Sequence, residues 1–115
     1  MHELAIANSI VDTVLDEAAR RNLKAITAVG LRVGDLTDIV PEALEFGFSA
    51  IISNTPLQGV RLEIERVPLG GTCRACSESF DIKEMVFACP RCGSGKIKID
   101  RGEELDIAYI EVGDD

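Results

Sequence analysis

The sequence predicts an α+β fold, in which two helices pack on a small mixed three-stranded sheet and a cysteine-rich module is inserted ahead of the last strand. Two observations support this prediction. Segments with apolar residues at helical spacing alternate along the chain with segments in which apolar and polar residues alternate. Four cysteines are confined to residues 73–92, which follow neither pattern. A chain of 115 residues has room for one small domain with one such insertion.

The first element is an amphipathic helix, predicted over Glu3–Arg21. Charged side chains occupy one side of it, and Asn22 and the two residues that follow close it. The apolar stripe recurs every three or four residues and consists of Leu4, Ala7, Val11, Val14 and Ala18. The helix is therefore expected to begin almost at the first residue.

The elements that follow are predicted in the order strand, helix, strand. Alternation predicts a strand over residues 25–33, which ends at a turn at Gly34-Asp35. Pro41 is suited to the first turn of a helix that extends to about Asn54. The apolar stripe of this second helix consists of Leu44, Phe48, Ile51 and Ile52. Residues 60–67 alternate again and predict the second strand.

The pattern is interrupted at Gly70-Gly71 and resumes in a last strand over residues 104–112. We therefore expect one α/β domain made of residues 1–69 and 102–115, with residues 70–101 inserted as a separate module. The module holds six basic and four acidic residues, a net charge of +2, so the remainder of the chain carries −10. The acidity belongs to the α/β domain.

Composition and charge exclude several classes of protein. A formal net charge of −8 disfavours general binding to nucleic acids or anionic membranes, which normally requires a basic surface. No apolar run reaches the roughly 20 residues of a transmembrane helix. The first residues lack the basic segment and uninterrupted apolar run of a signal peptide. A cytoplasmic protein is expected, in which cysteines serve more often as metal ligands than in disulfides.

The cysteines form two matched pairs, Cys73-x-x-Cys76 and Cys89-x-x-Cys92, separated by twelve residues. Two residues between ligands allow one tight turn to direct both thiolates at the same ion, and four thiolates are the ligand set of structural zinc. A module of this size buries too little apolar surface to fold alone, so metal binding should supply much of its folding free energy. The alternatives are a redox dithiol pair and two disulfides.

The chain contains one histidine, His2, next to the amino terminus. Nickel(II) and copper(II) favour square-planar sites built from nitrogen donors. The Met1 amine, the deprotonated His2 amide and the His2 imidazole can close two fused chelate rings around one such ion. The Glu3 amide, its carboxylate or water can supply a fourth donor. A histidine at position 2 can also be an ordinary exposed residue, and the dipeptide by itself does not decide between the two.

The stretches MHELAIANSIVDTVLDEA and VPEALEFGF, followed by the double Cys-x-x-Cys insertion, resemble the HypA family of hydrogenase-maturation nickel metallochaperones in the same order and over nearly the full length. The resemblance implies nickel bound at Met1, His2 and Glu3. It implies structural zinc at Cys73, Cys76, Cys89 and Cys92. It also implies two partners, a HypB-type nucleotide hydrolase and the large subunit of [NiFe]-hydrogenase. Some family members are thought to bring a second histidine to nickel, and this chain has none.

Two other functional classes are less consistent with the sequence. An enzyme is disfavoured because no second histidine is available to activate a nucleophile, the cysteines are assigned to zinc, and no phosphate-binding loop motif occurs. A zinc-ribbon module that binds nucleic acid or protein would use Arg74, Arg91, Lys96 and Lys98. It has few aromatic residues for base stacking, and Phe80 and Phe87 are expected to pack inside the module. The Gly70-Gly71 break leaves a monomer or a strand-swapped dimer as alternatives.

Overall fold

The computed structural model describes residues 2–113 and divides the chain into two compact units. The first unit comprises the chain up to Arg32, residues 38–65, and the chain from Asp106 onward. The second unit comprises Val33–Thr37 and Arg66–Leu105, and so contains all four cysteines. No helix in the described part of the chain is both long enough and apolar enough to cross a bilayer.

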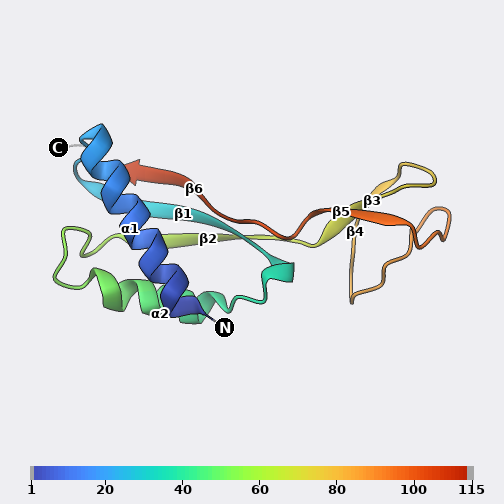
Figure 1. Ribbon diagram of the computed structural model, residues 1–115, viewed down its shortest axis with the longest axis horizontal. Coiled ribbons are helices and arrows are strands. Elements are labelled where there is room, and N and C mark those ends of the chain that lie inside the picture. The colour runs from blue at the N-terminus through green and yellow to red at the C-terminus, as the bar shows by residue number, and fades with distance from the viewer. Residues whose placement is uncertain (1, 114–115) are drawn as a thin grey trace. The chain divides into compact units, whose positions relative to one another are not determined.

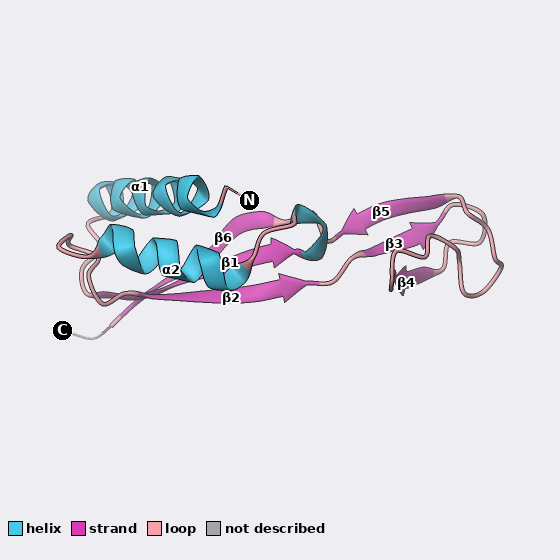
Figure 2. Ribbon diagram, turned by 90° about the horizontal axis from the view of Figure 1, so that it is seen from below, coloured by secondary structure: helices cyan, strands magenta, loops and turns pink. Residues whose placement is uncertain are grey.

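Two helices and a three-stranded sheet build the α/β part, as the sequence predicted (Figure 1). The helices are α1 (Glu3–Arg21) and α2 (Pro41–Ile52), and Figure 2 shows them on the same side of the sheet. The strand order is β2-β1-β6, with bounds β1 Ile26–Gly34, β2 Arg61–Val67 and β6 Leu105–Val112. The predicted fold class is confirmed.

The core of the first unit lies between the helices and β1. Its fully buried side chains include Phe48 and Leu44 of α2, Val14 of α1, and Val29 and Leu31 of β1. The predicted stripes are largely correct, because these residues recur at helical or strand spacing.

One residue of the predicted α1 stripe is placed differently. Leu4 is 59% exposed, although it lies over Gly47 of α2, and Ile10, which was not in the stripe, is buried. Leu4 is at the first turn of the helix, beyond the part of α1 that faces the core. Its apolar side chain is therefore left on the surface beside the start of the chain.

Local signals fix the ends of both helices. His2 is the N-cap of α1, and its carbonyl accepts the first helical hydrogen bond from the Ile6 amide. At the other end Asn22 has a left-handed backbone, and the Leu23 amide bonds back to the Ala18 carbonyl, as in a Schellman cap. Pro41 occupies the first turn of α2, where its missing N–H group costs nothing.

The second unit contains a sheet of its own, which the sequence did not predict. Its strands are β3 (Gly70–Cys73), β4 (Ser79–Asp81) and β5 (Ile97–Arg101), in the order β4-β3-β5, and both neighbours are antiparallel to β3. A short 3-10 helix, η1 (Asp35–Thr37), lies in the same unit where a simple turn was expected.

Gly70-Gly71 is part of β3, so the expectation that these two glycines interrupt the strand pattern was wrong. A Cβ atom on Gly71 would lie 2.5 Å from the carbonyl oxygen of Lys98 on β5, closer than real Cβ contacts allow. Glycine is required there because the two backbones approach each other closely. The pair of glycines therefore serves strand packing.

The second unit has a small apolar core. Outside the short segment 33–37, its buried apolar residues are Leu69, Ile82 and two of the cysteines, Cys73 and Cys89. Phe80 is half-buried and Phe87 is 38% exposed, so the expectation that Phe87 packs inside the module was wrong. Since so little apolar surface is buried, the fold of this unit depends on its cysteines.

Candidate metal centres

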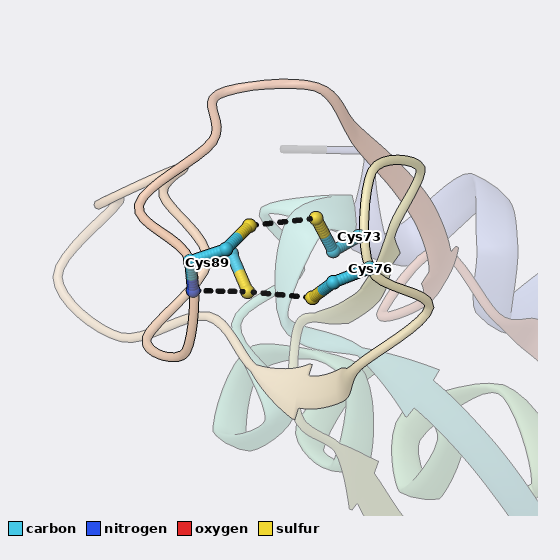
Figure 3. Close-up of side chains that lie close together, drawn as sticks. Cys73, Cys76 and Cys89 are labelled. Atoms are coloured by element: carbon cyan, nitrogen blue, oxygen red, sulfur yellow. Dashed lines mark hydrogen bonds between the residues drawn. The ribbon is translucent and has the colours of Figure 1, made fainter.

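The structure brings the four cysteines of the second unit together. The sulfurs of Cys73 and Cys92 lie 3.5 Å apart, those of Cys76 and Cys89 lie 3.6 Å apart, and all four lie within 4.8 Å of one another. Figure 3 shows the sulfurs of Cys73 and Cys76 directed toward the loop that holds Cys89. Each close contact joins one cysteine from each pair.

The two loops that hold the cysteines have the same backbone design. In the first, the Ser77 amide donates to the Cys73 carbonyl, and the Ala75 amide donates to the Cys73 sulfur at 3.3 Å. In the second, the Gly93 amide donates to the Cys89 carbonyl, and the Arg91 amide donates to the Cys89 sulfur, also at 3.3 Å. Amides directed at a sulfur stabilise a thiolate. Each loop is therefore prepared to hold its first cysteine as a metal ligand.

This donor set fits zinc. Sulfurs at the corners of a tetrahedron with Zn–S bonds of about 2.3 Å would be about 3.8 Å apart, close to the two short contacts. Disulfide sulfurs lie about 2.05 Å apart, and all four cysteines are free thiols in this structure. Backbone hydrogen bonds, first at Cys76 and then at Ala75, lower the pKa of the Cys73 thiol to about 6, toward the thiolate that binds metals.

The residues predicted for nickel lie at the start of α1, in the first unit. Met1 is outside the described residues. His2 is exposed and has no capping hydrogen bond from its side chain. Because the first amides of a helix have no intrahelical acceptor, the amides of His2 and Glu3 are not used by the hydrogen bonds of α1. A metal can therefore take the place of the His2 amide proton without breaking a helical hydrogen bond.

Glu3 makes a contact that the sequence did not reveal. Its carboxylate accepts a hydrogen bond of 3.0 Å from the amide of Val40, the N-cap residue of α2. The amino group at the start of the chain, and after it the Val40 amide, lower the pKa of the Glu3 carboxyl to about 2. Glu3 therefore remains ionised at neutral pH and ties the start of α1 to the start of α2. Pro41 marks the start of α2 in the sequence, but no local signal pairs it with Glu3.

An exposed apolar surface adjoins this corner of the first unit. Leu4, next to Glu3, is 59% exposed, Val40 is 50% exposed, and Phe46 is 79% exposed. The contacts between Glu3 and Val40 and between Leu4 and Gly47 bring the segments that carry these side chains together. We call Leu4, Val40 and Phe46 the apolar corner. Phe46 lies outside the predicted stripe of α2. Its position two residues from both Leu44 and Phe48, which puts it on the opposite side of the helix, is the sequence feature that could have predicted its exposure.

Comparison with known proteins gives a consistent result. Residues 1–112 match the family described as "Hydrogenase/urease nickel incorporation, metallochaperone, hypA". Among curated relatives, the hydrogenase maturation factor HypA of Roseiflexus sp. (strain RS-1) is 40% identical over 116 residues, covering 100% of this chain and 94% of the relative. The hydrogenase maturation factor HypA of Geobacter metallireducens is 40% identical over 112 residues, covering 97% of this chain and 99% of the relative.

Two solved structures have a similar fold. The solution structure of a HypA protein superposes with a TM-score of 0.73 at 19% sequence identity, covering 97% of this chain and 96% of the other. The solution structure of the Ni metallochaperone HypA from Helicobacter pylori gives a TM-score of 0.68, also at 19% identity, with 97% of each chain covered. The family match over residues 1–112 and the 40% identity decide the assignment: this chain belongs to the HypA family of nickel-incorporation metallochaperones, a family of metal carriers and not of enzymes.

Proposed function

We propose that the protein binds one nickel(II) ion at its amino terminus, through Met1, His2 and Glu3, and delivers it for the maturation of [NiFe]-hydrogenase. The observation that carries the proposal is the placement of His2 as the exposed N-cap of α1 in a chain of this family. The imidazole and the His2 amide are both free of helical hydrogen bonds, and fused chelate rings can form only when the amine, the next amide and the imidazole are consecutive.

The Glu3 carboxylate accepts a hydrogen bond from the Val40 amide, so we assign to Glu3 a role in nickel binding that leaves this hydrogen bond intact. Its backbone amide supplies the fourth donor, while its carboxylate offsets the positive charge of the ion. The N-terminus of a helix disfavours a cation by about 0.3–1 kcal/mol, and a nearby carboxylate and deprotonated amide counter that effect. Nickel that had to displace Val40 from the carboxylate would bind more weakly.

We assign a structural zinc ion to Cys73, Cys76, Cys89 and Cys92. Four thiolates leave no open coordination position, so this site shapes the second unit and does not carry cargo. The two metals then have separate donor sets, nitrogen-rich for nickel and all-sulfur for zinc. Thiolates that must stay reduced also suit the cytoplasm, where we place the protein.

The apolar corner is proposed as the contact for a HypB-type nucleotide hydrolase, before transfer of nickel to the hydrogenase large subunit. It lies next to Glu3, so a partner seated there would be adjacent to the metal. Exposed aromatic side chains such as phenylalanine are enriched in protein interfaces. The acidic first unit would speed association with a basic partner surface, and this acceleration should diminish as the salt concentration rises.

The proposal is tested by calorimetric titration of nickel into zinc-loaded protein without a tag. The native chain should bind one nickel ion, and His2→Gln and His2→Ala should weaken binding at least about tenfold, which corresponds to about 1.4 kcal/mol. Zinc content should not change in any of them. If both variants bind nickel as the native chain does, His2 is an ordinary exposed residue and the proposed site is wrong.

A further inference from the structure

Most of the positive side chains without an ion pair in the described residues belong to the second unit. Of the eight arginines in the sequence, all but Arg74 form an ion pair with a carboxylate; the paired ones are Arg20, Arg21, Arg32, Arg61, Arg66, Arg91 and Arg101. Within residues 2–113, five basic side chains form no ion pair with a carboxylate. One, Lys24, is in the first unit, and four are in the second: Arg74, Lys83, Lys96 and Lys98. Arg74, Lys96 and Lys98 are all exposed. Their charges are therefore available to a binding partner.

The pairing of β3 with β5 places Lys98 on one face of the β4-β3-β5 sheet and continues to Arg74 and Lys96, which lie one residue beyond the ends of these strands. Thr72 of β3 is paired with Lys98 of β5, and two residues further along the Arg74 amide donates to the Lys96 carbonyl at 2.8 Å. Residues that are directly paired across antiparallel strands lie on the same face, as do alternate residues along a strand. Arg74, Lys96 and Lys98 therefore form a cluster that we call the cationic row.

At the other end of β5, near Asp100 and Arg101, the charges on this face are compensated by contacts within the sheet. The Thr72 hydroxyl donates to Asp100 at 2.6 Å. The Arg101 guanidinium donates to Asp81 and Asp100 and to the Phe80 carbonyl. Ion pairing thus satisfies one end of β5 and leaves the end at Lys96 and Lys98 uncompensated.

The cationic row borders a free strand edge. β5 is the last strand of the sheet, so one side of its backbone has no neighbouring strand among the described residues. Because the Lys96 carbonyl is bonded toward β3, alternation of the antiparallel ladder directs the Ile97 carbonyl and both backbone groups of Ile99 to the outer edge. The Ile97 amide is already used, since it donates to the Gly95 carbonyl at 3.1 Å. An edge of this kind can pair with an extended polypeptide.

We propose that the cationic row and the free edge of β5 form a docking surface for an extended acidic segment of a partner protein. The segment adds to β5 as a fourth strand and sets its carboxylates against Arg74, Lys96 and Lys98. Backbone pairing requires a polypeptide. Nucleic acid fits less well, because Phe80 is paired with Gly71 and so lies on the opposite face, which leaves the row without a stacking aromatic from β4. This surface is independent of the proposed nickel site.

The test uses the zinc-loaded full-length chain and a fluorescein-labelled peptide of four Glu-Val repeats, with binding followed by fluorescence anisotropy. Exposed ion pairs are each worth about 0.2–1 kcal/mol. We therefore expect Lys96→Gln with Lys98→Gln to weaken binding about threefold, and the addition of Arg74→Gln to weaken it about tenfold in total. The matched control is Lys24→Gln, at a first-unit lysine that forms no ion pair with residues 2–113, and it should change binding less than about twofold.

Four outcomes would overturn the proposal. The first is equal affinity in the Lys96→Gln, Lys98→Gln chain with its zinc retained. The second is unchanged affinity for a peptide methylated at alternate backbone nitrogens, which cannot pair with an edge. The third is tighter binding of an eight-nucleotide RNA than of the peptide. The fourth is loss of zinc or self-association in the double variant, which would mean that the lysines serve the metal centre or protect the edge. Nickel affinity is not affected by any of these results.

Discussion

Ser77 and Gly93 occupy equivalent positions in the two cysteine loops, each one residue after the second cysteine of its pair. Both have a left-handed backbone, with φ of 67° and 78° respectively. Glycine adopts this conformation without strain, whereas other residues pay about 1–2 kcal/mol. The second loop therefore has the favoured residue, and the first loop bears strain at Ser77 that metal binding must offset.

Gly93→Ala should destabilise the zinc-bound second unit by about 1 kcal/mol. A Cβ atom at Gly93 would have no neighbour within 4 Å, so the cost is conformational and not a clash. Gly95→Ala is the control, because Gly95 lacks the left-handed backbone and also has room for a Cβ atom. Competition with a zinc chelator measures the difference, and equal zinc retention in the two variants would contradict the strain argument.

Residue chemistry made parts of both candidate centres predictable. The Cys-x-x-Cys spacing predicted the cluster because each pair of cysteines lies in one tight turn that directs both sulfurs to the same side. Such a turn depends only on neighbouring residues. The contact of Glu3 with Val40 was not predictable, because it joins residues far apart in the sequence through a backbone amide that no side chain marks. The cationic row was visible only as basic residues, since its shared face depends on the register of β3 and β5.

At the scale of elements, α2 presents two phenylalanines to opposite environments. Phe48 is 1% exposed in the core of the first unit, and Phe46 is 79% exposed in the apolar corner. Helical periodicity separates them by about 200° around the helix axis. The sequence pattern predicted that Phe48 is buried, because it lies four residues after Leu44 on the same stripe. The pattern assigned no packing role to Phe46. The exposed ring is therefore available for a partner.

Phe48→Ala and Phe46→Ala should separate stability from partner binding. Phe48→Ala leaves a cavity and should cost about 3–5 kcal/mol of unfolding free energy, whereas Phe46→Ala should stay within about 0.5 kcal/mol. Urea unfolding measures both values.

Phe46→Ala should nevertheless reduce capture by a HypB-type partner, while nickel affinity stays at the native value. Val112→Ala, at an exposed apolar residue of β6, is the control for partner capture. Undiminished capture by the Phe46→Ala chain would remove the apolar corner from the interface.

Element boundaries were predicted within a few residues wherever a cap or a proline marked them, as at Asn22 and Pro41. The β4-β3-β5 sheet escaped prediction because its strands are three to five residues long and carry little alternation. Such short strands depend on the cysteine loops to bring them together. The cysteines therefore determine where these strands form, and the alternation of residues within the strands does not reveal them.

At the scale of the whole molecule, the two units differ in what stabilises them. The first unit has a buried apolar core, whereas the second buries few apolar residues besides its cysteines. Removal of zinc should therefore unfold the second unit and leave much of the first folded.

Cys73→Ser tests this difference between the units. Amide hydrogen exchange should show lost protection in β3, β4 and β5, while α1, α2 and β1 keep theirs. Ser79→Ala, in the same unit, removes no sulfur ligand and only a long hydrogen bond of 3.4 Å from Arg101, so it should leave protection nearly unchanged. Protection lost equally in both units would mean that the chain folds as one cooperative block, and zinc retained by the Cys73→Ser chain would contradict the four-thiolate site.

Nickel affinity should also depend on pH in a way that separates the two metals. Protons compete with nickel for the terminal amine, the His2 amide and the imidazole, so affinity should fall steadily as the solution becomes more acidic. Titrations at several pH values, with zinc content followed in parallel, measure this. Nickel affinity that does not change with pH would be inconsistent with nitrogen donors.

The central claim is that nickel binds at the free amino terminus, and the most direct measurement changes only that group. Nickel is titrated calorimetrically into two zinc-loaded chains, the native one and one with a single glycine added before Met1, which moves the amine out of the chelate ring and retains His2 and Glu3. A chain with one glycine added after Asp115 is the control. We predict that the amino-terminal addition weakens nickel binding at least about tenfold and that the carboxyl-terminal addition has no effect. Equal nickel affinity in all three chains would contradict it.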